Sequence, residues 1–282
     1  KQRQQTKMNM SKHHPHYKNL LQINQLSQIN EIVHFSTTRM GGISNGSYSS
    51  FNMGNFSDDS PLNIHENRKL LAHMFYMNMS DFIVPHQTHG TRVLKIDEEF
   101  LNLDHTTSIE IMYGVDSVIT NIKDKFLCVT TADCVPIIIY DRKSKAIAAI
   151  HAGWKGTSGK IVEKTISAMQ NEYNSSTKDM LVGIGPAISQ RNYEVGEEVI
   201  KEMETNGIDL SDAEVCIKNY NSSKCHINLK EINRRELIDL GVLESNIETT
   251  ELCTFDKQEL FFSARRQTVH SGRMLTGIMI KS

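Results

Sequence analysis

Long apolar segments are missing from this sequence of 282 residues. No run of about eighteen apolar residues occurs, which excludes a membrane-spanning helix. A strong charge of one sign is missing as well, because the formal net charge is only −2. This balance gives no field that would hold nucleic acid or an anionic membrane, so the sequence favours a small-molecule partner.

Cysteine is sparse, and its spacing excludes a small secreted disulfide scaffold. The chain has five cysteines, an odd number without dense regular spacing. We therefore expect reduced thiols and a cytoplasmic protein. The cysteines are Cys128, Cys134, Cys216, Cys225 and Cys253.

The first residues differ in composition from the rest. Residues 1–19 are rich in Lys, Gln, Asn and His and lack the apolar stretch of a secretory signal, so we expect a flexible leader. Its clustered histidines are expected to be inert. Residues 20–282 show no composition break and no internal repeat, and the chain is 39% hydrophobic, which predicts one domain with a substantial core.

Hydrophobic patterning predicts an α/β (α+β) domain of mixed strands flanked by helices. Helices are expected at residues 63–79, 157–173, 195–203 and 229–240. Strands are expected at residues 32–38, 82–84, 91–96, 116–120, 126–130, 136–140, 146–150, 181–185 and 275–280.

Two of these runs, 136–140 and 146–150, flank a short polar segment, a pattern typical of a hairpin or tight connection. Antiparallel pairing would bring Cys134 and His151 to the same edge of the sheet.

Three short segments carry candidate metal ligands. Residues 86–90 read His-Gln-Thr-His-Gly, residues 131–134 end in Cys134, and residues 151–156 open with His151. Imidazole nitrogen and thiolate sulfur are ligands that zinc prefers, and three protein ligands leave a fourth position for water or substrate. The first segment offers either His86 or His89.

Other residues allow both a functional and a structural interpretation. Asp133 could orient a histidine or accept a proton, or it could serve an ordinary turn. Trp154 could wall a pocket or pack in the core. Arg39, Arg265 and Arg266 are candidates for anion recognition, and we expect one of the last two to face inward.

Several motifs together resemble one family over about residues 32–280. They are Ser36-Thr37-Thr38-Arg39-Met40-Gly41-Gly42, His86 to Gly90, Thr131 to Cys134, His151 to Gly156, Gly185-Pro186-Ala187-Ile188 and Phe261 to Arg266. The chain resembles the bacterial laccase-domain or polyphenol oxidase family, reassigned as purine nucleoside phosphorylases. The resemblance implies an α/β sandwich similar to deamidating toxin catalytic domains that use a Cys-His pair.

The resemblance also implies the site residues. The zinc ligands would be His89, Cys134 and His151, with copper the less favoured metal and His86 at most a pocket residue. The catalytic residues would be Asp133, Cys134 and Arg39. We expect substrate to be bound by Arg39, Asn52, Gln87, Trp154, Lys155, Arg265 and Arg266.

The implied activity is phosphorolysis of adenosine, inosine and S-methyl-5′-thioadenosine to the free base and a (methylthio)ribose 1-phosphate, with adenosine deamination as a second reaction. We expect Arg39, with Arg265 or Arg266, to hold phosphate near the anomeric carbon while the metal and Asp133 serve the purine. The His-x-Glu and Pro-Cys-x-x-Cys motifs of the usual zinc deaminases do not occur in the chain. The partners would be purine nucleosides and phosphate, and the protein a monomer or homodimer.

Three alternatives stay open. In a cysteine hydrolase or deamidase, His151 would activate Cys134 as a nucleophile. A copper-dependent polyphenol oxidase would need several copper centres, and the remaining histidines outside the leader are scattered along the sequence. A non-catalytic partner of cell-envelope or division machinery would turn over no nucleoside.

Overall fold

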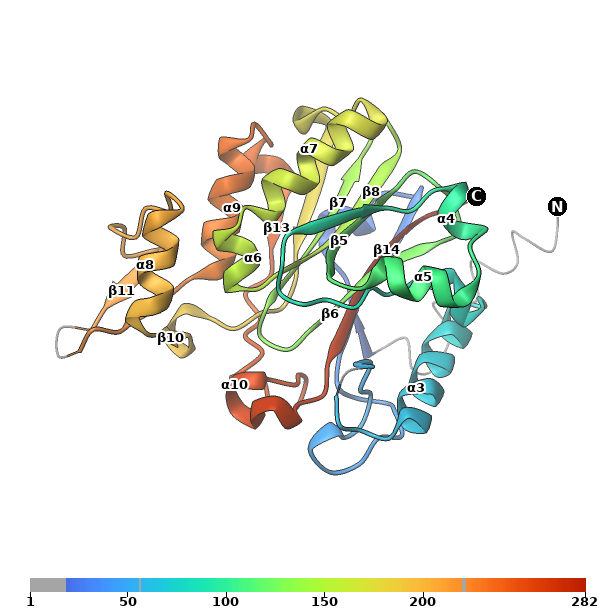
Figure 1. Ribbon diagram of the computed structural model, residues 1–282, viewed down its shortest axis with the longest axis horizontal. Coiled ribbons are helices and arrows are strands. Elements are labelled where there is room, and N and C mark those ends of the chain that lie inside the picture. Colours follow the sequence, from blue (N-terminus) through green and yellow to red (C-terminus); the bar gives the residue numbers. More distant parts are fainter. Residues whose placement is uncertain (1–18, 56, 220–221) are drawn as a thin grey trace.

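The computed structural model describes residues 19–55, 57–219 and 222–282, so all of the expected leader except Asn19 lies outside the described residues. The described part forms a six-stranded, a five-stranded and a three-stranded sheet with helices around them (Figure 1). This architecture confirms the predicted mixed α/β class. None of the described helices is long and apolar enough to cross a bilayer.

Within each sheet the spatial order of the strands differs from their order along the chain. From edge to edge, the six-stranded sheet contains β13 (Ile247–Thr249), β9 (Met180–Ile184), β7 (Val135–Asp141), β8 (Ala146–Ala152), β5 (Val115–Thr120) and β4 (Arg92–Lys95). The five-stranded sheet contains β1 (Leu20–Leu21), β2 (Ile32–Thr37), β14 (Met274–Ile280), β6 (Phe126–Thr131) and β3 (Phe82–Ile83). The three-stranded sheet contains β10 (Glu194–Val195), β12 (Cys225–Ile227) and β11 (Cys216–Lys218).

The helices connect and cover these sheets. They are α2 (Asn24–Ser27), α3 (Pro61–Met74), α4 (Glu98–Leu101), α5 (His105–Met112), α6 (Trp154–Ser158), α7 (Ile161–Tyr173), α8 (Glu197–Thr205), α9 (Leu229–Asp239) and α10 (Ala264–Gln267).

The two larger sheets pack face to face, as the alternation along β7 shows. Successive residues of a strand point to opposite faces. Ile137 and Ile139 enter a core shared with α7 and α9, whereas Ile138 and Tyr140 enter a second core between the sheets. A third core lies between the five-stranded sheet and α3. The result is a sandwich with helices on both outer faces (Figure 1), and its likeness to toxin domains stays a prediction.

The predicted strand pair is confirmed and fixes the site. β7 and β8 are antiparallel, with Pro136 opposite His151. Cys134 therefore immediately precedes β7, next to the end of β8. β5 pairs with the other side of β8, with Ser117 opposite Ile150, so Asp116 lies beside His151.

The predicted helix at residues 157–173 is wrong in its bounds, because the chain forms two helices there. α6 begins earlier, at Trp154, and α7 begins at Ile161. Between them Lys160 adopts a left-handed conformation with φ of 63°, which breaks the helical path. The helix expected to begin at residue 195 instead follows β10 and begins at Glu197.

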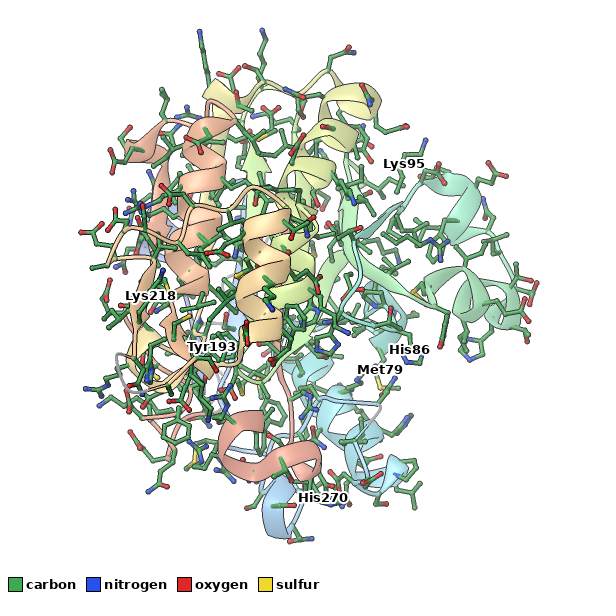
Figure 2. All side chains as sticks on the ribbon, turned by 60° about the vertical axis from the view of Figure 1, so that its left-hand side comes forward. Met79, His86, Lys95, Tyr193, Lys218 and His270 are labelled. Carbon is green, nitrogen blue, oxygen red and sulfur yellow. The ribbon has the colours of Figure 1, made fainter. Side chains whose placement is uncertain are left out.

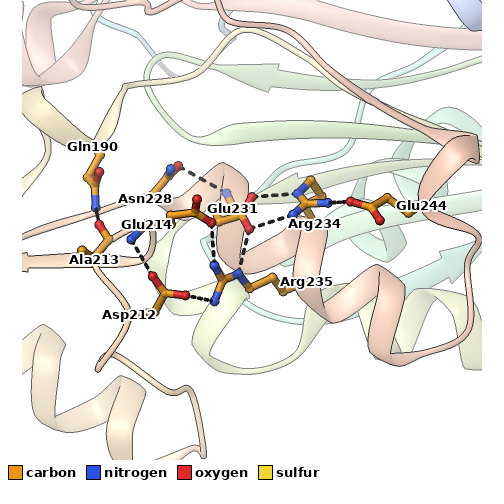
Figure 3. A network of polar contacts seen from close by, with 9 residues as sticks. All are labelled: Gln190, Asp212, Ala213, Glu214, Asn228, Glu231, Arg234, Arg235 and Glu244. Carbon is orange, nitrogen blue, oxygen red and sulfur yellow. Dashed lines mark hydrogen bonds and ion pairs between the residues drawn. The ribbon is translucent and has the colours of Figure 1, made fainter.

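A surface network ties the three-stranded unit to α9 (Figure 3). Glu231 accepts hydrogen bonds from Arg234 and Arg235, and Arg235 also pairs with Asp212 at 2.8 Å. An exposed pair alone contributes little, but linked pairs restrain one another. The residues drawn also include Gln190, three positions before Tyr193, whose side-chain amide donates to the carbonyl of Ala213 at 2.9 Å.

Glu236 on α9 is a buried acid and predicts a pH-dependent stability. Its side chain is 8% exposed, and neither carboxylate oxygen has a hydrogen-bond partner of normal geometry among the described residues. Burial raises its pKa from 4.5 to about 7. Relative to the ionised form, the protonated Glu236 side chain therefore stabilises the fold fully below pH about 4.5, and this contribution to the free energy of unfolding is lost as pH rises through about 7.

Between pH 5 and pH 8 the parent chain should therefore lose about 2–3 kcal/mol of stability relative to Glu236→Gln, whose amide does not ionise. Urea unfolding at both pH values measures this difference. Glu204→Gln, at an exposed position of α8, is the matched control. Parallel pH profiles of Glu236→Gln and the parent would contradict the role given to Glu236.

Candidate metal centre

His89, Cys134 and His151 meet at the edge of the sandwich. One ligand atom from each lies within 4.8 Å of the others, and the two imidazole rings are edge to face with centroids 4.9 Å apart. Tetrahedral zinc holds such atoms about 3.5 Å apart, so a small contraction would complete the site. His86 is not part of this group, because its ring packs edge to face against Tyr113 at 4.6 Å.

Asp116 orients two of the three ligands, and the sequence interpretation missed it. Its carboxylate accepts the backbone N–H groups of Thr88, His89 and Gly90 at 3.2, 3.0 and 2.7 Å. It also lies 2.7 Å from Nδ1 of His151. Carboxylates that fix histidine ligands in this way are usual around zinc. Asp116 thus leaves Nε2 of His151 as the nitrogen for a metal.

The charges of the group favour metal binding. Burial opposes ionisation of Cys134, but His151 and His89 outweigh it and lower the pKa of the thiol to about 6. Burial likewise opposes the charged form of His151, but Cys134 and Asp116 raise its pKa to about 9. The sulfur is therefore a thiolate, the form that acts as ligand or nucleophile.

Close backbone approach shapes the site. His89 has a positive φ of 63°, a conformation that its N–H contact with Asp116 helps to hold. A Cβ at Gly153 would lie 3.0 Å from Sγ of Cys134 and 3.1 Å from Cδ2 of His89. A side chain at this position would crowd two of the candidate ligands, which favours glycine where the chain leaves β8.

The ligand group lines a cavity of about 460 Å³, a size typical of small-molecule sites. The described residues around it include two that the sequence interpretation missed, Tyr193 and Arg273. The cavity is lined by Gly54, Gln87, His89, Thr130, Thr131, Ala132, Asp133, Cys134, His151, Tyr193, Ala264, Arg265 and Arg273. Tyr193 and His86 lie far apart in Figure 2, in agreement with the exclusion of His86 from this lining.

Asp133 lies in the cavity wall with its carboxylate already hydrogen-bonded. It accepts the hydroxyls of Thr254 and Ser263 at 2.6 and 2.9 Å and the N–H of Arg265 at 2.7 Å. Its φ of 87° turns the chain between β6 and Cys134. Asp133 thus anchors the start of α10 beside the thiolate, and its role as proton acceptor stays a prediction.

The three predicted arginines differ in their placement. Arg265 lines the cavity, with its guanidinium 5.1 Å from the centre of the Tyr193 ring. Arg266 donates to three backbone carbonyls, and Arg39 donates to two others and stacks on Phe262 at 4.7 Å. Arg265, although more exposed than Arg266, is therefore the member of the pair that lines the cavity.

The other expected substrate-binding residues occupy different surroundings. Gln87 lines the cavity and is hydrogen-bonded to the backbone of Thr130. Asn52 is buried, and its Oδ1 accepts the N–H of Arg273 at 2.9 Å. Trp154 and Lys155 begin α6 and are not among the lining residues, with Nζ of Lys155 5.5 Å from the Trp154 ring centre.

Known proteins resemble this chain along nearly its whole length. Residues 33–281 match the family described as multi-copper polyphenol oxidoreductase laccase. A Bacteroides thetaiotaomicron protein named purine nucleoside phosphorylase is 41% identical over 263 residues, 93% of this chain and 97% of that protein. Adenosine deaminase RL5, from an unknown prokaryotic organism, is 36% identical over 88% of this chain and 93% of its own. The crystal structure of the hypothetical protein YfiH from Bacillus licheniformis superposes with a TM-score of 0.85 at 29% identity, covering 93% and 97% of the two chains.

Proposed function

The chain belongs to the multi-copper polyphenol oxidoreductase laccase family, and from this premise we propose that it is a cytoplasmic purine nucleoside phosphorylase. Its substrates would be phosphate with adenosine, inosine or S-methyl-5′-thioadenosine. The observation that carries the proposal is a single cavity with the His89, Cys134 and His151 group beside two arginines, Arg265 and Arg273.

The two arginines suit the phosphate. Guanidinium groups bind phosphate oxygens through paired N–H donors, and both lie in the cavity wall. In phosphorolysis a phosphate oxygen forms a bond to the anomeric carbon while the bond from that carbon to the purine nitrogen breaks. The electron pair of the broken bond goes to the base, which takes up a proton. Cations around the phosphate hold this anion next to the neutral nucleoside and orient the attacking oxygen.

The metal that fits this donor set is zinc. Two imidazoles and a thiolate, one imidazole being held by a carboxylate, are a zinc-type environment with an open position. When bound, zinc would supply Lewis acidity toward the purine or toward water. His89, Cys134 and His151 would hold it. The catalytic roles expected of Asp133 and Arg39 stay predictions, and of these two residues only Asp133 is among the described residues that line the cavity.

The neighbouring arginines provide a matched pair of variants. Arg265→Gln is expected to raise the KM for phosphate by at least about tenfold with little change in Tm, because it removes a charge from the cavity wall. Arg266→Gln should instead lower Tm, because it leaves three backbone carbonyls without their donor. Steady-state kinetics and thermal unfolding distinguish the two, and equal effects of both variants on KM would contradict the assignment.

Product analysis tests the proposed reaction directly. Zinc-loaded protein is incubated with adenosine with and without phosphate, and adenine, hypoxanthine and inosine are resolved by chromatography. Adenine that requires phosphate supports phosphorolysis. Release of no base above the trace level of an inactive variant would overturn it and leave the non-catalytic partner as the better account.

Adenosine deamination is proposed as a second reaction of the same cavity, supported by the relative named adenosine deaminase. Water would add to the purine ring and ammonia would leave, giving inosine. In the same chromatographic assay inosine should form without phosphate, and inosine or its base hypoxanthine should form with phosphate. A product pattern with neither inosine nor hypoxanthine would remove this second activity.

A cysteine hydrolase is favoured by one observation, the alignment of Cys134, His151 and Asp116 in the order nucleophile, base and orienting acid. The metal distinguishes it from the leading proposal. A metal centre is supported if the protein, purified without added metal, contains one equivalent of zinc and if Cys134 is alkylated only after a chelator has removed the zinc. A metal-free protein with freely alkylated Cys134 supports the hydrolase.

A further inference from the structure

A second cavity system lies between α3, β3 and the segment that carries α4 and α5. It consists of two hollows of about 290 and 680 Å³. Both are lined by Asn55, Arg68, Met79, Phe82 and Val84, so they form one continuous groove, which we call the α3–α5 groove. None of its described lining residues belongs to the wall of the metal centre.

The walls of the groove are mainly apolar. Leu71 of α3 and Leu275 of β14 line the smaller hollow, and Leu103 and Met112 line the larger one near α5. Met79 lies close to His86 in Figure 2, where the two hollows approach α5. Apolar walls of this extent favour a hydrocarbon body over a sugar or nucleotide.

The titratable groups that line the groove are all basic. Arg68 contributes a permanent positive charge, and His65, His86 and His105 are the others among the described lining residues. No Asp or Glu belongs to this described lining. A ligand that fits both the walls and the charge is therefore an anion with an apolar body.

Arg68 has an open binding edge. Its Nε and Nη2 both donate to the carbonyl of Met53, at 3.2 and 2.8 Å, and the described residues provide it with no ion pair. The other edge, formed by Nη1 and the second hydrogen of Nη2, is left for a further acceptor. Two parallel N–H donors match the two oxygens of a carboxylate.

The surroundings of Arg68 make an anion favourable. Burial lowers the pKa of Arg68 to about 10, so its surroundings disfavour the charged form although the residue is only half-buried. A partly desolvated cation without an anionic partner is destabilising, and a bound anion would offset that penalty.

We propose that the α3–α5 groove binds an amphiphilic monocarboxylate, with its carboxylate on the open edge of Arg68 and its hydrocarbon chain along Phe82 and Val84 toward α5. The site is separate from the metal centre and does not depend on the phosphorylase activity.

Calorimetric titration of the full chain with decanoate tests the charge. The parent should bind decanoate saturably and bind 1-decanol and butyrate at least about tenfold more weakly, because each lacks one half of the recognised structure. Arg68→Gln should weaken decanoate at least about tenfold and leave 1-decanol unchanged. Arg142→Gln, at an exposed position in the β7–β8 connection, removes the same charge elsewhere and should change neither.

Two further variants keep the test independent of folding. Arg68→Lys retains the charge but loses the paired donors, so its decanoate affinity should fall between those of the parent and Arg68→Gln. Val84→Trp should fill the groove and weaken both decanoate and 1-decanol. Each of three results would overturn the proposal. They are equal affinity of the parent for decanoate and 1-decanol, undiminished binding of decanoate by Val84→Trp, and no saturable binding of decanoate by the parent.

Discussion

Cys134→Ala is expected to lower phosphate-dependent adenine release by more than about 100-fold and to reduce bound zinc from one ion per chain to a small fraction of that. Substitution of a residue that only hydrogen-bonds to a zinc ligand lowers zinc affinity by about 10–100-fold. Loss of a ligand itself should therefore lower zinc affinity further. The substitution leaves His89 and His151 as a pair without the thiolate that lies between them. Zinc analysis by mass spectrometry and the chromatographic assay measure the two effects.

The control for this prediction is Cys128→Ala. Cys128 is a buried thiol of β6 in the core beneath α3, so its loss should affect stability without affecting zinc. A Cys134→Ala protein that retains full zinc occupancy and turnover would show that the metal, or the chemistry, lies elsewhere. Zinc loss from Cys128→Ala to the same extent would show that the measurement reports folding rather than ligation.

The relation of Cys134 to His151 could be predicted because it depends on local sequence. Two apolar runs joined by five polar residues pair as neighbours in an antiparallel manner, and such pairing places the two outer ends side by side. The observed register, with Pro136 opposite His151, confirms that inference. The third ligand, His89, came from family resemblance, since no local pattern distinguishes it from His86.

Asp116 and Arg273 could not be predicted because their roles depend on distant pairing. Asp116 is the second residue of β5, a strand that the sequence shows only as an ordinary buried run, and its partner His151 is 35 residues away. Only the pairing of β5 with β8 brings the two together. Arg273 likewise enters the cavity wall because Asn52, 221 residues away, binds its N–H.

Asp116→Asn is expected to weaken zinc binding by about 10–100-fold and to lower turnover at a fixed limiting zinc concentration to a similar extent. The carboxylate holds the backbone of residues 88–90 and Nδ1 of His151 at once. An amide retains only one acceptor oxygen and turns an N–H₂ donor toward groups that also donate. Both His89 and His151 would therefore lose their orientation. Competition with a chromophoric chelator measures the zinc affinity.

Asp141→Asn separates this effect from a general loss of stability. Asp141 is also a buried carboxylate at a strand end, and it accepts the backbone N–H groups of Lys143, Ser144 and Ser176, but it lies at the opposite end of β7 from Cys134. Both substitutions should destabilise the fold by about 1–3 kcal/mol, because both leave buried N–H groups without an acceptor. Only Asp116→Asn should change zinc affinity. Equal zinc affinities of the two variants would mean that the Asp116 carboxylate supports the sheet edge and not the metal ligands.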